Sequence, residues 1–229
     1  KAVDEYAPLL RESAANPGND YRLGAHEAPP AIVSVFLGEQ LEDVLNQLCE
    51  KGEATSSKEG TNANIGVSTV PKFKMDATDR NRTSPFAFTG NKFEFRMVGS
   101  SASIADANIV LNTIVAETLC QAADLLESSS DVEMAAHDLI KKWVSEHIRI
   151  IFNGNGYSEE WVAEAARRGL PNITNMVDAA GCLTDPKTIE LFERHNVLTK
   201  VELAAREEVA YEIYSKAVNI EARTMIDMA

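Results

Sequence analysis

Apolar residues at helical spacing fill the second half of this chain, and this pattern constrains the fold more than any other feature. One set predicts a helix that ends near Ser128, with a shared buried face made of Ile104, Leu111, Val115, Leu119, Ala122 and Leu126. Ser103 with Asp106, and Thr199 with Glu202, have the spacing of N-terminal capping boxes and predict two helix starts. The expected buried stripe of the last helix consists of Ala205, Val209, Ile213, Ala217 and Ile220. We therefore predict a helical C-terminal region over residues 103–229.

The first 102 residues have a different character, with short strand-like runs between segments rich in Gly, Pro, Asn and Thr. The apolar, β-branched run Ala31–Leu37 predicts a buried strand. A second strand is predicted by strict alternation, in which Phe93, Phe95 and Met97 share one face. We expect an α+β protein, in which a partial antiparallel sheet within residues 1–102 is followed by a helical bundle.

The opposite face of that second strand carries charges, namely Lys92, Glu94 and Arg96. Glu94 and Arg96 are two positions apart, which places them ~7 Å apart on one face of an extended strand. Such a row can be the solvated side of an antiparallel sheet. It can equally form the floor of an active site that holds a metal and a carboxylate. The pattern alone leaves both interpretations open.

Composition narrows the classes of partner. The chain has 35 acidic residues against 22 basic ones, and its formal net charge of −13 disfavours nucleic acid because the surface repels phosphate. No apolar run approaches the ~20 residues that cross a bilayer, so we expect no membrane partner. Cys49, Cys120 and Cys182 are far apart and outside any C-x-x-C pair, which favours a reducing, cytoplasmic location. The histidines lack ligand spacing and are expected to be packing or surface residues.

Two further segments concentrate groups that suit anionic ligands. Arg22 and Glu27 lie in a Gly- and Pro-punctuated segment just before the first strand, and binding groups gather on loops of a rigid scaffold. Arg80 and Arg82 flank Asn81, so both guanidinium groups would face one side if the segment is extended. A phosphate or carboxylate would resolve the repulsion between them, since Arg offers a planar fork of donors. Plain surface turns and solvated arginines are the alternative.

Together these segments resemble a known family. The stretch Asn19–Pro29 resembles the glutamine synthetase segment Asn-x-Tyr-x-Arg-Leu followed by Glu-Ala-Pro. The run from Asp79 to Arg96, which contains Arg-Asn-Arg and Lys-Phe-Glu-Phe-Arg, is similar over its whole length to the signature of the type III class. The strong resemblance covers about residues 16–112. It implies that residues 1–102 are the C-terminal part of a catalytic domain and that 103–229 form the helical C-terminal region of that class.

The resemblance implies substrate-binding roles for four residues. Arg22 and Arg96 would bind the substrate glutamate. Arg82 would contact both glutamate and the transferred phosphoryl group. Lys92, which stands where shorter classes of the family have Arg, would contact ATP.

It also implies the catalytic and metal-binding groups. Glu27 would lie on a flap that closes the site and would take a proton from ammonium, with Arg82 as the second catalytic residue. Glu94 would be a ligand to Mg²⁺ or Mn²⁺, which prefer carboxylate oxygens. The implied reaction joins ammonia to glutamate through γ-glutamyl phosphate with ATP as co-substrate, in a cytoplasmic, homo-oligomeric ring.

The chain is expected to be a fragment of that enzyme. Lys1 replaces an initiator Met, and the helical pattern reaches Ala229 without a stop signal. The other metal-binding residues of the family precede the part seen here, and Glu94 alone cannot hold several cations, so we predict that this polypeptide by itself is inactive. Two alternatives stay open: a non-catalytic helical module for oligomerisation or regulation, and a relative of glutamate–cysteine ligase or guanidino kinases. The role of residues 51–75 is not decided.

Overall fold

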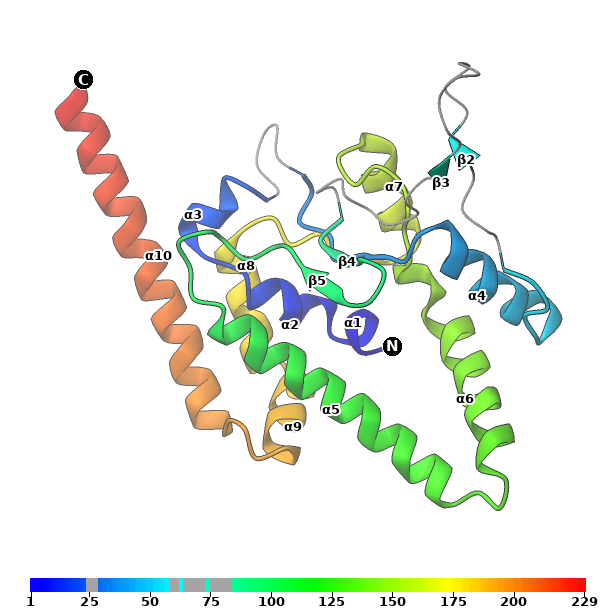
Figure 1. Cartoon of the computed structure of the whole chain (residues 1–229). Helices are drawn as coiled ribbons and strands as arrows, with labels where there is room; N and C mark the ends of the chain where they lie inside the picture. The colour runs from blue at the N-terminus through cyan, green and yellow to red at the C-terminus, as the bar shows by residue number, and fades with distance from the viewer. Residues whose placement is uncertain (24–28, 58–61, 64–72, 75–83) are drawn as a thin grey trace.

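The computed structural model describes residues 1–23, 29–57, 62–63, 73–74 and 84–229. It is mostly helical with a small sheet near its middle, which confirms an α+β fold (Figure 1). The helices of the first part are α1 (Ala2–Glu5), α2 (Ala7–Glu12), α3 (Pro17–Asp20) and α4 (Glu39–Lys51). Those of the second part are α5 (Ala105–Glu127), α6 (Val132–His147), the 3-10 helix η1 (Ile148–Ile150), α7 (Glu159–Arg167), α8 (Met176–Ala180), the 3-10 helix η2 (Gly181–Thr184), α9 (Pro186–Arg194) and α10 (Lys200–Met228).

The central sheet contains three short strands in the order β1 (Val35–Phe36), β4 (Phe86–Phe88) and β5 (Phe93–Phe95). A separate antiparallel pair joins β2 (Asn62–Ala63) to β3 (Phe73–Lys74). β4 and β5 are antiparallel, but β1 and β4 run parallel. The expectation of an antiparallel sheet is therefore corrected to a mixed one, because the chain crosses over between β1 and β4 and does not turn straight back.

The segment around β1 is held by the second half of the chain. Ile32 forms an antiparallel bridge with Asn172, and Val35 forms a parallel bridge with Ile151. The N–H of Phe152 donates to the carbonyl of Val35 at 2.9 Å. The predicted strand over 31–37 thus has two strand residues within a longer extended segment, and besides β4 its partners come from connections between helices.

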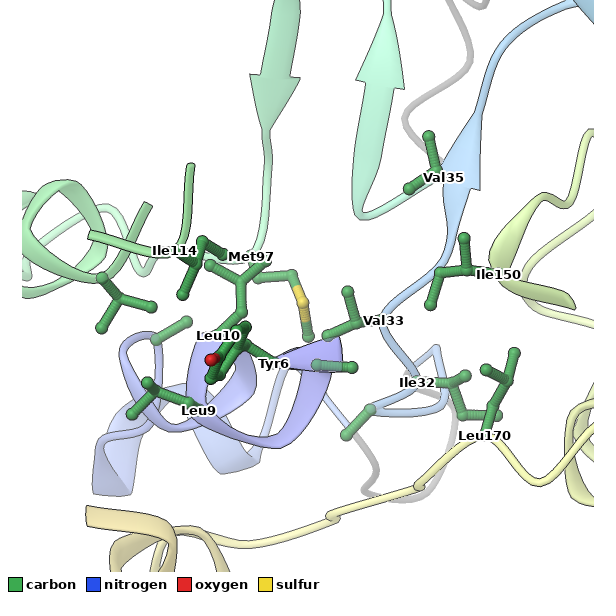
Figure 2. Close-up of a cluster of buried hydrophobic side chains, with 14 of the residues drawn as sticks. Tyr6, Leu9, Leu10, Ile32, Val33, Val35, Met97, Ile114, Ile150 and Leu170 are labelled. Carbon is green, nitrogen blue, oxygen red and sulfur yellow. The ribbon is translucent and has the colours of Figure 1, made fainter. Parts of the chain in front are cut away.

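One hydrophobic cluster draws side chains from both halves (Figure 2). Leu9 and Leu10 of α2 lie at its centre and are 2% and 0% exposed. Around them gather side chains from the β1 segment, the end of β5, α5 and the connections beyond α6, including Val33, Met97, Ile114, Ile150 and Leu170. Residues on both sides of position 102 share this core, and the domain division at that position stays a prediction.

Several helix boundaries follow the signals in the sequence. Gly52 ends α4 in the left-handed region with φ 84°, where a residue without Cβ is favoured. Thr199 and Glu202 form the predicted capping box, with the Thr199 N–H donating to Glu202 Oε2 at 2.8 Å. The box expected at Ser103 is wrong: Ile104 is the N-cap residue of α5, and Ser103 Oγ only accepts from the Ala105 N–H at 3.1 Å.

The two long helices bury different faces from those predicted. On α5 the buried residues are Ala107, Val110, Thr113, Ile114 and Glu117, whereas Ile104, Val115 and Leu119 are 64%, 44% and 63% exposed. On α10 Leu203 and Ala210 are buried, whereas Val209, Ile213 and Ile220 are 50%, 49% and 66% exposed. Apolar side chains lie on more than one side of each helix, so periodicity predicted the helix but chose the wrong face.

The length of α5 bears on the expected absence of a membrane partner. By length and composition alone, this helix could cross a membrane, and among the described residues it is the one helix that meets both criteria. Its centre nevertheless packs against other parts of this chain, because Ile114 lies in the shared core and Glu117 pairs with α9. Figure 1 shows α5 beside α1 and α2, while α10 lies along the flank of the molecule with its C-terminal end projecting outward.

Candidate functional site

The charged row predicted on β5 is present. Lys92 Nζ lies 2.9 Å from Glu94 Oε1, and Arg96 Nη2 lies 3.2 Å from Glu94 Oε2. Arg96 Nε also donates to Glu94 Oε2 at 3.2 Å. A carboxylate between two cations therefore lies on one face of the strand, with 38% of its side chain exposed.

An aromatic layer on the other face of the hairpin holds this row in place. Cross-strand pairing sets Phe86 opposite Phe95 and Phe88 opposite Phe93. The ring centroids of Phe86 and Phe93 lie 5.4 Å apart in a stacked arrangement, and those of Phe88 and Phe93 lie 5.2 Å apart. Phe93 is nevertheless 49% exposed, so the predicted apolar face is only partly buried.

The two flanking cations change the acidity of Glu94. Hydrogen bonds from Lys92 and then from Arg96 lower the pKa of this carboxyl below its ordinary value. Glu94 is therefore ionised at neutral pH. It can accept from cations or, after exchanging its present partners, offer an oxygen to a hard metal ion.

A second charged group reaches the same part of the molecule from α3. Arg22 is exposed in the turn after this helix, and its Nη1 donates to Asn19 Oδ1 at 3.0 Å. The same Nη1 donates to the carbonyl of Val98 at 3.3 Å. Val98 is two residues beyond Arg96, so the structure brings the segment of Arg22 next to the segment of the charged row.

Local capping and long-range contacts fix the α3 segment. Asn16 caps the helix by accepting from the Asn19 N–H at 2.9 Å, and Pro17 occupies the first turn. Asp20 Oδ2 accepts from the Met176 N–H at 2.9 Å, which ties α3 to α8. Tyr21 donates to Glu221 Oε2 of α10 at 2.8 Å. The segment before Arg22 is a short helix clamped between two others.

Of the six predicted site residues, the structure brings together the side chains of Lys92, Glu94 and Arg96, and it places Arg22 against the backbone of Val98, two residues after Arg96. Glu27 and Arg82 lie outside the described residues. So does Arg80, the other arginine of the predicted pair. Their predicted roles stay predictions.

The donor set for a metal is incomplete within the described part of the chain. Glu94 supplies one ionised carboxylate, which is a suitable oxygen ligand for Mg²⁺ or Mn²⁺. Across the ranges that the structure describes, no group of three or more His, Cys, Asp or Glu side chains could hold a metal ion. Glu94 therefore fits the role of one ligand in a site completed by other residues.

Asn19 is a residue of this region to which the sequence analysis assigned no role. Its side chain is buried, with 1% of the residue exposed, and it bonds to three different segments. Its place within Asn19-Asp-Tyr-Arg-Leu23 was visible, but its hydrogen bonding depends on Met97, which lies far away in the sequence.

A second carboxylate with several side-chain partners lies away from this region. Glu117 of α5 accepts from Arg194 Nη1 at 2.5 Å, from His195 Nε2 at 2.8 Å and from Gln121 Nε2 at 2.7 Å. Its side chain is only 3% exposed. Burial alone would raise the pKa of Glu117, but these hydrogen bonds and the charge of Arg194 lower it below its ordinary value. His195 here is a packing residue, as expected for the histidines.

A cavity of about 560 Å³ between α2, α5 and α10 contains a third carboxylate, that of Glu12. Burial, together with the charge of Asp106, raises the pKa of this carboxyl to about 8, although the charges of Arg11 and Arg206 act in the opposite direction. Among the residues that the structure describes, none donates a hydrogen bond to it. Apolar side chains make up most of the walls, including Ile109, Phe192 and Val209.

Comparison with known proteins shows which family the sequence of this chain matches. The family described as glutamine synthetase C-terminal domain matches residues 135–229. A type-3 glutamine synthetase of Dictyostelium discoideum is 45% identical over 231 residues, which cover 100% of this chain and 31% of that protein. A glutamine synthetase of Butyrivibrio fibrisolvens is 43% identical over 232 residues, covering 99% and 32%. One from Bacteroides fragilis strain YCH46 is 43% identical over 235 residues, again covering 99% and 32%.

The chain belongs to the glutamine synthetase family. Within that family its likeness over the whole chain supports the type III class. The chain spans about a third of the length of the curated relatives that it matches.

Proposed function

We propose that this chain forms part of the active site of an ATP-dependent glutamate–ammonia ligase. The single observation that carries the proposal is the approach of the Arg22 segment to the strand of Glu94 and Arg96, through the contact of Arg22 with Val98 at 3.3 Å. Two segments more than seventy positions apart, each rich in groups for anions, meet there. A merely solvated strand face would not need this neighbour.

Arg22 and Arg96 hold the carboxylate groups of glutamate in this proposal. A guanidinium group offers several donors in a plane, which matches a carboxylate better than an ammonium does. Arg22 is exposed and is anchored by neutral oxygens, so its positive charge is available to an anionic ligand. Arg96 already binds a carboxylate, that of Glu94, and would share its donors with the substrate.

Phosphoryl transfer requires that negative charge be neutralised. The γ-carboxylate of glutamate attacks the γ-phosphorus of ATP, the bond to the bridging oxygen breaks, and ADP leaves. Arg82 and Lys92 are the cations that we assign to the transferred group. Glu94 would hold Mg²⁺ or Mn²⁺ together with ligands from elsewhere in the enzyme, and the metal supplies further charge neutralisation when bound.

The second step forms the amide. Ammonium loses a proton to the carboxylate of Glu27, and the resulting ammonia attacks the carbonyl carbon of γ-glutamyl phosphate, which releases phosphate. A carboxylate beside Ala28 and Pro29 has the apolar neighbours that raise basicity. Because the chain carries one predicted metal ligand, the isolated polypeptide is expected to be inactive. The intact enzyme is expected to act in the cytoplasm.

The first test compares Arg22→Ala with Arg223→Ala in the full-length enzyme. Both remove an exposed arginine, but Arg223 lies on α10 and has no assigned role. We expect Arg22→Ala to raise the KM for glutamate by roughly ten- to a hundredfold, the value of a lost hydrogen bond to a charged group, with the KM for ATP unchanged. An unchanged KM for glutamate would remove Arg22 from the substrate site.

The second test separates the two chemical steps. Glu27→Ala should still form ADP from ATP and glutamate, but should lose ammonia-dependent formation of glutamine. Arg82→Ala should lose both. If Glu27→Ala abolished ADP formation to the same extent, the proton-acceptor role would be wrong.

The helical region supports a second role, in assembly of the intact enzyme. Eight apolar residues of α10 are more than 40% exposed, namely Val201, Val209, Ile213, Val218, Ile220, Met225, Ile226 and Met228. Exposed apolar surface of this extent marks an interface. Replacing Ile220, Met225 and Ile226 by Ser in the full-length enzyme should dissociate the homo-oligomeric ring in analytical ultracentrifugation. An unchanged sedimentation coefficient would exclude this surface from assembly.

A further inference from the structure

We propose that Asn19 is a positioning residue, whose buried side chain holds Arg22 against the segment that follows β5 and so sets the place of its guanidinium group beside the charged row. The inference rests on the role proposed for Arg22 in binding glutamate. It adds a residue that touches no substrate and acts through another side chain.

The hydrogen bonds of Asn19 explain why an amide is needed at this position. Its Nδ2 donates to the carbonyl of Ala14 at 2.6 Å and to that of Met97 at 2.8 Å. Its Oδ1 accepts from Arg22 Nη1 at 3.0 Å. An amide has two N–H donors and one carbonyl oxygen, and all three are used here. Asp lacks the donors and Ser is too short to reach three partners.

These bonds join segments that are far apart in the sequence. Ala14 follows α2, and Met97 follows β5 and is 1% exposed within the shared core. Asn19 therefore connects the core, the strand that carries Glu94 and Arg96, and the turn that carries Arg22. The two bonds that Asn19 Nδ2 donates are buried and hold the amide in a defined geometry, from which its oxygen reaches the partly buried bond to Arg22.

The anchor fixes Arg22 without neutralising it. Both acceptors of Arg22 Nη1, Asn19 Oδ1 and the Val98 carbonyl, are uncharged oxygens. In the described part of the chain, no carboxylate forms an ion pair with Arg22. The remaining guanidinium donors and the full positive charge are thus left for an anionic ligand. Arg194 shows the contrast, because its positive charge is already paired with the carboxylates of Glu117 and Glu190.

The test uses double-mutant analysis in the full-length enzyme. Asn19→Ala should raise the KM for glutamate about tenfold, the value of one lost bond to a charged group, while the KM for ATP stays unchanged. In an Arg22→Ala background the same substitution should have no further effect on the KM for glutamate, because the group that it positions is gone. Asn175→Ala serves as the control, since it removes the N-cap of α8 without touching Arg22.

The outcomes separate this inference from the proposed function. A raised KM in Arg22→Ala with an unchanged KM in Asn19→Ala would overturn the positioning role alone. A further loss in the double variant, or an equal change in both KM values, would show that Asn19 is merely structural. An unchanged KM in Arg22→Ala would overturn the role of Arg22 and this inference with it.

A second variant covers the case in which Asn19→Ala does not fold. Asn19→Ser keeps a hydroxyl at this buried position, which leaves a polar neighbour for the carbonyls of Ala14 and Met97 but is too short to hold Arg22 as well. It should raise the KM for glutamate about tenfold, with the KM for ATP unchanged. An unchanged KM for glutamate in folded Asn19→Ser enzyme would overturn the proposal.

Discussion

Glu94 and Glu117 are both carboxylates that pair with an arginine and with at least one further side chain, yet they differ in burial. Glu117 is 3% exposed, and three side chains from α5, α9 and the residue after α9 satisfy it. Glu94 is 38% exposed on a strand face beside the Arg22 segment. A buried and fully bonded carboxylate locks helices together, whereas an exposed one can exchange its partners for a ligand. Burial therefore separates the structural carboxylate Glu117 from Glu94, for which we propose a binding role.

The largest expected effect on stability is at Glu117, the buried carboxylate. Glu117→Ala removes the carboxylate that binds Arg194, His195 and Gln121, and the loss of hydrogen bonds to a charged group costs about 1.5–3 kcal/mol. We expect that loss in the free energy of local opening of α5 and α9, measured by amide hydrogen exchange. Glu190→Ala is the control, because it removes the other, exposed partner of Arg194 and should leave exchange unchanged. A decrease of less than about 1 kcal/mol in the free energy of local opening in Glu117→Ala would contradict the structural role of Glu117.

The pH dependence of this cluster has a defined sign. The pKa of Glu117 is lower in the folded protein than its ordinary value of 4.5, so its stabilisation is present above that value and is lost as the pH falls through the folded pKa. In the wild-type protein, protonation of Glu117 at acid pH should lower the free energy of local opening of α5. Glu117→Gln should be less stable at neutral pH and should lack that part of the acid dependence.

Glu12 offers an intermediate case, a carboxylate in a mostly apolar cavity without a hydrogen-bond donor among the described residues. Its pKa is raised to about 8, so its favourable contribution is present below 4.5 and is lost as the pH rises through about 8. Glu12→Gln should increase the free energy of unfolding by on the order of 2 kcal/mol above that pH and by much less in acid, since part of the penalty is screened by solvent. Urea unfolding followed by circular dichroism at both extremes measures the difference. Equal effects at the two pH values would contradict the assignment.

The smallest expected effect on stability is at Glu94. Glu94→Gln should leave the urea midpoint unchanged, because both ion pairs of this exposed carboxylate are accessible to water. In the full-length enzyme it should reduce glutamine formation at least about tenfold and raise the concentration of Mg²⁺ needed for half-maximal activity. Glu212→Gln on α10 is the matched control, since this carboxylate also pairs with an exposed lysine and should change neither quantity. A fall in the urea midpoint with unchanged activity would reverse the comparison.

The contrast between α4 and α5 shows how far local patterns reach. The end of α4 at Gly52 follows from a local requirement of the backbone, because a left-handed C-cap favours a residue without Cβ. For α5 the helix itself was predicted, but its buried side was not. Its apolar residues surround the axis, and the choice between Ile114 and Val115 depends on what packs against the helix.

The candidate site divides in the same way. The alternation around Glu94 predicted a charged strand face, and the ion pairs with Lys92 and Arg96 confirm it. Asn19 could not be assigned a role from the sequence, because its function depends on carbonyls of Ala14 and Met97 that only the fold brings together.

By itself the sequence determined the long helices α5 and α10, the capping box of α10, the charged row of β5 and the family, since these depend on residue type and spacing within short stretches. Tertiary structure alone decided which helix faces are buried, that β1 pairs in parallel with β4, and that Arg22 lies against the end of the β5 segment. Those features arise from contacts between residues tens of positions apart, which compete for the same buried space.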